Sequence, residues 1–183
     1  MIRIGRVWFP VISLGYGNRL GVWFQGCGKD CRNCISPEFR DRDDGSVCLV
    51  EDILGVIEQE AQVDGLTVSG GEPFDQPEGL LELVMAYKEQ VNDDILVFTG
   101  YSLEELHQQK SETIENILQN IAVLVDGRYV DEMNDGAGLR GSANQNIYIW
   151  KQKDRHADLE TAARTVQCVF MDDYLWMIGI PPR

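Results

Sequence analysis

The chain has 183 residues, of which 44% are hydrophobic and 25% charged, and a formal net charge of −14 at pH 7. Such acidity argues against a nucleic-acid partner, because phosphate binding needs a basic surface; it is typical of a solubility device or of steering toward a basic patch on a partner protein. No apolar run approaches the roughly 18 residues that span a bilayer, and the N-terminus carries no signal peptide, so we expect a cytoplasmic protein without membrane contact.

The predicted elements of the N-terminal half begin with two apolar, β-rich runs at 7–12 and 20–24, separated by a glycine-rich turn. The second run leads directly into Cys27, which opens a loop that continues as a polar, solvated stretch over 36–46. Apolar spacing then predicts a helix over 49–57 and a short buried strand at 66–68.

The C-terminal half alternates helices and strands. Helical stripes are expected at 80–91 and 114–121, and a capping box at Ser102 starts a short helix between them. Compact strands are expected at 95–99, 123–125 and 147–150, with a long polar loop over 128–145. The tail favours two strands, 165–171 and 174–180, around Asp172 and Asp173, or a hairpin docked on a sheet edge. The pattern of 151–164 leaves helix and loop both open.

This alternation predicts an α/β fold, because short and fully apolar strands joined by helices are typical of a parallel sheet. A closed eight-fold barrel takes about 250 residues, so we expect an open, partial (β/α) barrel of five or six mostly parallel strands with a C-terminal β extension. The chain reads as a single domain over 1–183, with a core at about 7–150 and the extension at 151–183.

Ligands bind at the carboxyl ends of the strands in such folds. The special sequences of this chain all follow predicted strands: Cys27, Gly70 to Pro73, Thr99-Gly100 and Asp126-Gly127. We therefore expect one active site at that edge of the sheet.

The first of these sequences holds three cysteines, Cys27, Cys31 and Cys34, with the spacing Cys-x3-Cys-x2-Cys. A four-iron cluster held by three thiolates leaves one iron open for a small molecule. A structural zinc site would close all four positions, and Cys48 is near enough in sequence to be its fourth ligand. Five cysteines in a cytoplasmic chain favour metal or catalytic roles over disulfides.

The second sequence is Gly70-Gly71-Glu72-Pro73. It is compatible with a simple strand-to-helix turn. Two glycines also let the backbone approach a ligand closely, and the Glu72 carboxylate together with backbone carbonyls suits an ammonium group.

Cys27-x3-Cys31-x2-Cys34 followed by Gly70-Gly71-Glu72-Pro73 resembles the radical S-adenosylmethionine enzymes, and within them the activating enzymes of glycyl radical proteins. The resemblance runs from about residue 7 to 147 and includes three further motifs in the same order: Trp23-Phe24-Gln25-Gly26, Thr99-Gly100-Tyr101 and Asp126-Gly127-Arg128-Tyr129. It implies reductive cleavage of S-adenosylmethionine at a [4Fe–4S] cluster and removal of hydrogen from a glycine of anaerobic ribonucleotide reductase. It also implies a low-potential electron donor such as flavodoxin or ferredoxin.

The resemblance assigns roles to particular residues. Cys27, Cys31 and Cys34 would hold the cluster, and Gly70, Gly71, Glu72 and Pro73 would bind the cofactor around its amino group. The backbone of Asn33, Cys34 and Ile35 would line the adenine, although many superfamily members carry an aromatic residue where this chain has Asn33. Thr99 and residues Asp126 to Arg128 would lie near the ribose and carboxylate ends. Asn144 and Gln145 would close the site from the last loop.

Other residues are interpreted as structural. His107 and His156 are expected at the surface, and Cys168 in a buried strand. Two alternatives stay open beside the activating enzyme: radical chemistry on another peptide or small molecule, which the extension beyond residue 151 suggests, and a zinc-stabilised binding module without catalysis.

Overall fold

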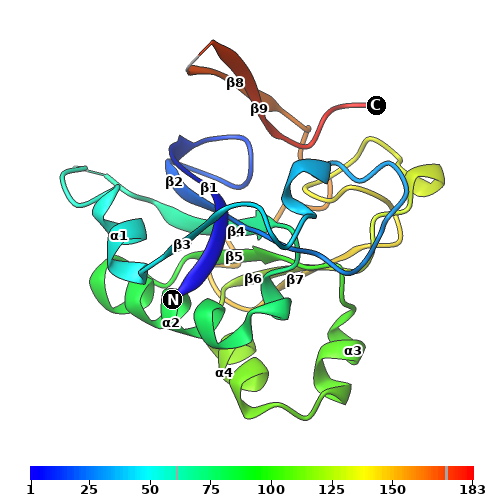
Figure 1. The fold of residues 1–183 in the computed structure, drawn as a ribbon. Coiled ribbons are helices and arrows are strands. Elements are labelled where there is room, and N and C mark those ends of the chain that lie inside the picture. The colour runs from blue at the N-terminus through cyan, green and yellow to red at the C-terminus, as the bar shows by residue number, and fades with distance from the viewer. Residues whose placement is uncertain (61, 172) are drawn as a thin grey trace.

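The computed structural model describes residues 1–60, 62–171 and 173–183 and centres on a seven-stranded sheet (Figure 1). The strands are arranged, from one edge to the other, as β3 (Ser46–Cys48), β1 (Ile2–Val11), β2 (Arg19–Phe24), β4 (Gly65–Gly70), β5 (Ile95–Phe98), β6 (Val123–Asp126) and β7 (Asn146–Ile149). Strands β2, β4, β5 and β6 are parallel, whereas β1, β3 and β7 pair antiparallel with their neighbours.

The parallel centre confirms the predicted α/β class, and β2 is buried along its whole length as a strand covered on both faces must be. The predicted number of five or six strands is wrong by at least one. The additional strand, β3, has only three residues and falls in a polar stretch that we expected to be loop, since two of its residues are exposed and no apolar pattern marks it.

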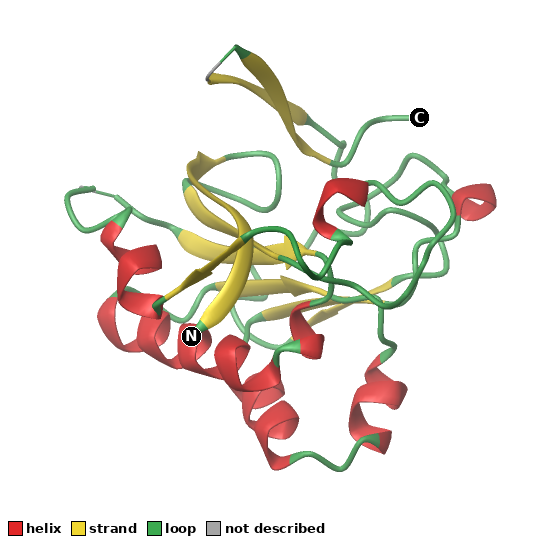
Figure 2. Cartoon of the chain, in the orientation of Figure 1, coloured by secondary structure: helices red, strands yellow, loops and turns green. Residues whose placement is uncertain are grey.

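Helices cover one face of the sheet, below it in the orientation of Figure 2. They are α1 (Val50–Gly55), α2 (Pro77–Gln90) and α4 (Glu112–Asn120), while α3 (Leu103–Gln108) lies beyond the end of the strands. Their apolar stripes form the main core with Val22, Val68 and Val97 of the sheet. The predicted capping box starts α3: Ser102 Oγ accepts from the Glu105 N–H (3.1 Å), and Glu105 Oε2 accepts from the Ser102 N–H (2.8 Å).

Loops and the C-terminal extension cover the opposite face, over a second core that includes Trp23, Val125, Leu139 and Ile178. Three short 3₁₀ helices lie in the loops: Pro37–Phe39, Pro73–Asp75 and Asp131–Met133. The extension ends in a hairpin of β8 (Val166–Met171) and β9 (Tyr174–Gly179), which stands above the sheet in Figure 1. This confirms the two predicted tail strands; residue 172 of the predicted turn lies outside the described residues.

Two expectations for the extension are wrong. Cys168 is exposed, because it lies opposite the exposed Met177 on a hairpin face that packs against little. His156 is fully buried, and its ring nitrogen Nε2 lies 3.0 Å from Asp94 Oδ1.

The alternative left open for residues 151–164 is decided in favour of turns, because no helix forms there. None of the helices described here is long and apolar enough to cross a membrane.

Candidate functional site

A pocket opens at the carboxyl ends of β2, β4, β5 and β6, where the sequence predicted the active site. It brings together eight of the predicted site residues: Cys27, Cys31, Cys34, Ile35, Gly70, Gly71, Glu72 and Thr99. These residues come from three separate loops, so the pocket exists only because the parallel strands end at one edge of the sheet.

The cysteine loop is tied down immediately after β2. The Gly26 N–H donates to the Phe39 carbonyl (2.9 Å), and the Cys27 N–H donates to the Arg40 carbonyl (3.0 Å). Asp30 and Arg40 form an ion pair across the same loop. These contacts close residues 27–40 into a ring whose inner side faces the pocket.

The three thiols are half-buried and free of disulfides. Burial raises the pKa of Cys27, although the Lys29 N–H, 3.4 Å from its sulfur, acts in the opposite sense, and burial likewise raises the pKa of Cys34. Among the residues described, no three His, Cys, Asp or Glu side chains converge on one metal ion. In a four-iron cluster each thiolate binds its own iron.

Cys48 lies on β3, opposite Ile2 of β1, and does not line the pocket. It packs beside the main core, and its thiol contacts the Ser46 carbonyl of its own strand. The arrangement therefore gives three pocket thiols without a fourth, and it disfavours the zinc site with Cys48.

The glycine pair packs against the cysteine loop. Gly70 has φ +106°, and a Cβ there would lie 2.3 Å from the Phe24 carbonyl oxygen. A Cβ on Gly71 would lie 2.3 Å from the Gly26 oxygen, and the Gly71 N–H donates to Phe24 (2.7 Å). The glycines therefore let the turn after β4 bind the backbone from which the cysteine loop starts, a reason for their presence beyond the ligand approach we expected.

Glu72 is completely buried beneath the pocket. Its Oε1 accepts from the Phe74 N–H (3.0 Å) and the Thr99 hydroxyl (2.8 Å), and its Oε2 accepts from the Gly100 N–H (2.8 Å). Burial raises the pKa of Glu72 to about 7, against the opposing effect of these donors and of Lys29. The carboxylate thus joins the ends of β4 and β5 and leaves about one of its four acceptor positions without a protein donor.

Five other predicted residues do not line this pocket: Asn33, Pro73, Asp126, Arg128 and Asn144. Asp126 is buried and accepts from the Leu103 N–H (2.6 Å) and from Asn146. Asn144 donates to the Arg128 carbonyl (2.8 Å), and Asn33, at φ +53°, donates to Asp131 (2.7 Å). These side chains join loops around the pocket.

The sequence did not predict the hairpin wall of the pocket or its two cationic residues, Arg6 and Lys29. Residues 177–180, from β9 and the chain after it, form that wall. Arg6 of β1 also lines the pocket, and its guanidinium lies 4.2 Å from the centre of the Trp176 ring. Lys29 approaches the face of Tyr101. The apolar tail strands were visible in the sequence, but nothing there indicates which edge of the fold they meet.

Comparison with known proteins gives a consistent picture. Residues 13–148 match the family described as a 4Fe-4S single cluster domain. The anaerobic ribonucleoside-triphosphate reductase-activating protein of Haemophilus influenzae is 33% identical over 147 residues, which are 75% of this chain and 91% of that protein.

Two more distant relatives extend the comparison. The protein of the same name from Escherichia coli K12 is 28% identical, over 77% of this chain and 95% of its own length. The pyruvate formate-lyase-activating enzyme of Clostridium pasteurianum is 31% identical, over 69% of this chain and 54% of its own length.

Proposed function

The chain belongs to the activating proteins of glycyl radical enzymes, within the radical S-adenosylmethionine superfamily, and from this premise we propose that it activates an anaerobic ribonucleotide reductase. Relatives that match this chain over nine-tenths or more of their own length are named as activating proteins of anaerobic ribonucleoside-triphosphate reductase. The [4Fe–4S] cluster follows from the matched family; S-adenosylmethionine is part of the proposal.

The donor set suits the cluster. Three half-buried thiols line one pocket together with apolar side chains. The raised pKa of Cys27 and Cys34 keeps these thiols protonated without metal, so cluster binding releases protons. When bound, the reduced cluster and S-adenosylmethionine together supply the radical that removes hydrogen from a glycine.

The remaining acceptor position of Glu72 suits the cofactor's ammonium group, with Gly70, Gly71 and Pro73 fixing the turn that carries it. We propose that the backbone of Asn33, Cys34 and Ile35 lies beside the adenine. Thr99 orients Glu72 through its hydroxyl. Asp126, Arg128 and Asn144 act on the cofactor's ribose side through the loops that they hold.

The proposed substrate is a loop of another protein, which needs an open entrance. In the described part of the chain the edge strands β3 and β7 are not paired with each other, which suits an open, partial barrel. Five free cysteines suit the reducing cytoplasm, where a flavodoxin or ferredoxin would supply the electron.

The observation that carries the proposal is the meeting of Cys27, Cys31, Cys34 and the buried Glu72 in one pocket. Anaerobic cluster reconstitution followed by an assay for 5′-deoxyadenosine tests it. We expect turnover with a strong reductant and, on adding an anaerobic reductase, a glycyl radical doublet in electron paramagnetic resonance. Absence of 5′-deoxyadenosine from protein with full iron and sulfide content would contradict the proposal.

Cysteine variants test the ligand assignment. Cys27→Ala, Cys31→Ala and Cys34→Ala should each abolish 5′-deoxyadenosine formation, because each removes one of three cluster ligands. Cys48→Ala and Cys168→Ala are the controls, since neither residue lines the pocket, and should retain activity. Equal loss in Cys48→Ala would refute the three-ligand assignment.

A second candidate, radical chemistry on another peptide or small molecule, is favoured by one observation. Residues 177–180 line the pocket although they lie beyond the matched family region. Efficient 5′-deoxyadenosine formation without a glycyl radical on any anaerobic reductase tested would favour this candidate.

A further inference from the structure

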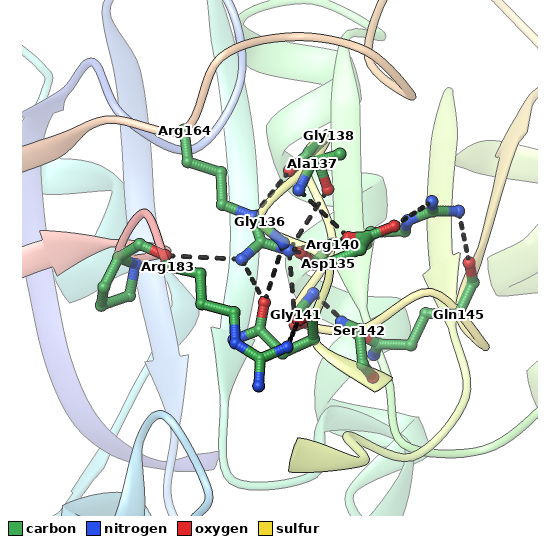
Figure 3. Close-up of polar contacts among 12 residues, drawn as sticks. Asp135, Gly136, Ala137, Gly138, Arg140, Gly141, Ser142, Gln145, Arg164 and Arg183 are labelled. Atoms are coloured by element: carbon green, nitrogen blue, oxygen red, sulfur yellow. Dashed lines mark hydrogen bonds and ion pairs between the residues drawn. The ribbon is translucent and has the colours of Figure 1, made fainter. Parts of the chain in front are cut away.

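Arg164 is a buried cation in the C-terminal extension, just before β8 and outside residues 13–148 of the family match. Its side chain has 0% exposure. Figure 3 shows its guanidinium at the centre of a ring of acceptors. The acceptors are Asn134 Oδ1 (2.7 Å) and the carbonyls of Ala137 (3.2 Å), Gly138 (3.3 Å), Arg140 (2.6 Å), Gly141 (3.3 Å) and Pro181 (3.4 Å).

These contacts are those of an organising centre rather than of a simple ion pair. Among the residues described, Arg164 pairs with the carboxylate of Asp135, 3.6 Å from Nη2, while backbone carbonyls accept most of its hydrogen bonds. A planar guanidinium has five N–H donors in a fixed fork. The loop over 134–141 therefore takes its shape by wrapping around this one side chain.

A chain of hydrogen bonds continues from that loop to the pocket. The Gly141 carbonyl accepts from Arg164, and the Gly141 N–H donates to Gln145 Oε1 (2.7 Å). Gln145 Nε2 then donates to the carbonyl of Gly127 (2.7 Å), at the end of β6. Gly127, Gly141 and Gln145 all line the pocket.

The same guanidinium also contacts the second wall. It donates to the Pro181 carbonyl, directly after Ile180, the last pocket residue from the hairpin side. Arg164 thus joins the loop wall, residues 127–145, to the hairpin wall, residues 177–180.

We propose that Arg164 is a positioning residue for the radical pocket, holding the loop wall and the hairpin wall at the spacing that the bound S-adenosylmethionine requires. The inference rests on the proposed function. It assigns the extension a task at the active site, although the extension lies outside the matched family region and carries none of the proposed cluster ligands.

Arg164→Lys tests the proposal without burying an apolar group in a polar ring. A lysine keeps the charge but has three donors on a compact ammonium, too few for the observed ring of acceptors. Arg183→Ala is the matched control. Arg183 belongs to the same cluster (Figure 3) and donates to the Asn134 carbonyl. It is exposed and does not line the pocket.

Two measurements on the anaerobically reconstituted holoprotein are compared. Hydrogen exchange should be faster in Arg164→Lys over 134–145 and 178–182, and unchanged over the helices. Equilibrium binding of S-adenosylmethionine should weaken about tenfold at unchanged iron and sulfide content. Arg183→Ala should match the wild type in both measurements.

Faster loop exchange with unchanged affinity would overturn the proposal, because Arg164 would then stabilise the loop without setting the pocket. Unchanged exchange and affinity would overturn it as well. If the wild-type holoprotein itself bound no S-adenosylmethionine, the proposed function and this inference would both fall. If the wild type bound S-adenosylmethionine and Arg164→Lys bound it with the same affinity, only the inference about Arg164 would fall.

Discussion

Gly71 is the residue at which the turn after β4 approaches the cysteine loop most closely. A Cβ added at Gly71 would lie 2.3 Å from the Gly26 carbonyl oxygen and 2.6 Å from the Phe39 carbonyl oxygen. Because both neighbours are backbone atoms, neither can rotate away as a side chain would. The position is therefore closed to every residue except glycine while the loop keeps its place.

Gly71→Ala should destabilise the metal-free, reduced protein by about 2 kcal/mol or more, since relief requires backbone displacement. Gly55→Ala is the control, because an added Cβ there meets nothing within 4 Å at the end of α1. It should be neutral or stabilising by up to about 1 kcal/mol. Urea unfolding measures both variants, and equal stabilities would show that the loop adapts to a side chain at position 71.

At the scale of single residues, the sequence predicts which side chains carry the chemistry better than it predicts which residues they contact. The three cysteines and Glu72 reach the predicted pocket because their positions follow from the strand ends. Asp126 does not, because a short carboxylate at a strand end has the same sequence pattern whether it faces a ligand or, as here, accepts from the Leu103 N–H at the start of α3. His156 is buried by Asp94, a partner 62 positions away that no local pattern indicates.

At the scale of elements, the β8–β9 hairpin was predictable and its docking was not. Apolar runs on each side of Asp172 and Asp173 indicate two strands. Their place depends on contacts that are distant in sequence. Trp176 packs edge-on against Trp8 with ring centres 5.9 Å apart, and Ser13 Oγ donates to the Ile178 carbonyl (2.6 Å).

Trp176→Ala should loosen the hairpin from β1 and destabilise the protein by about 2 kcal/mol, because it removes the Trp8 packing and the cation–π contact with Arg6. Urea unfolding measures the stability, and hydrogen exchange over 166–179 measures the attachment. Phe170→Ala, in the same hairpin but 75% exposed, should change stability by less than about 0.5 kcal/mol. Equal effects of the two substitutions would mean that the hairpin is not held through Trp176.

At the scale of the whole molecule, the parallel centre was predictable, whereas the strand β3 and the antiparallel pairing at the sheet edges were not. Repeated strand–helix units specify β4, β5 and β6, because helices follow the apolar strands β4 and β5 before the next strand begins. The antiparallel edge strands carry no such repeat, and β3 is too short to show a period. The place of the extension is likewise set by contacts between residues distant in sequence. These contacts lie at both the carboxyl and the amino ends of the sheet strands.

The extension is joined to the amino ends of the strands through Asp94. Its Oδ1 accepts from the buried Arg19 (3.1 Å) and lies 3.0 Å from His156 Nε2, and Arg155 Nε lies 3.4 Å from Oδ2. Burial alone would raise the pKa of Asp94, but the hydrogen bonds and charges of His156 and Arg19 outweigh it and hold that pKa below its usual value. The charged carboxylate is therefore the form that stabilises the fold.

Asp94→Asn should cost about 3 kcal/mol at pH 7, because it leaves Arg19 charged, fully buried and without its counter-ion. Asp93→Asn is the control, because the Asp93 carboxylate accepts only from the exposed Gln152 among the hydrogen bonds described. It should lower the free energy of unfolding by less than about 1 kcal/mol. Since the folded pKa of Asp94 is lowered, its contribution is complete above the unfolded pKa of about 4 and is lost as the pH falls through the folded value. The difference between wild type and Asp94→Asn in urea unfolding should therefore shrink as the pH falls below about 4. A difference that persisted or grew below about pH 4 would mean that the charged Asp94 carboxylate does not stabilise the fold and that the extension is held by other contacts.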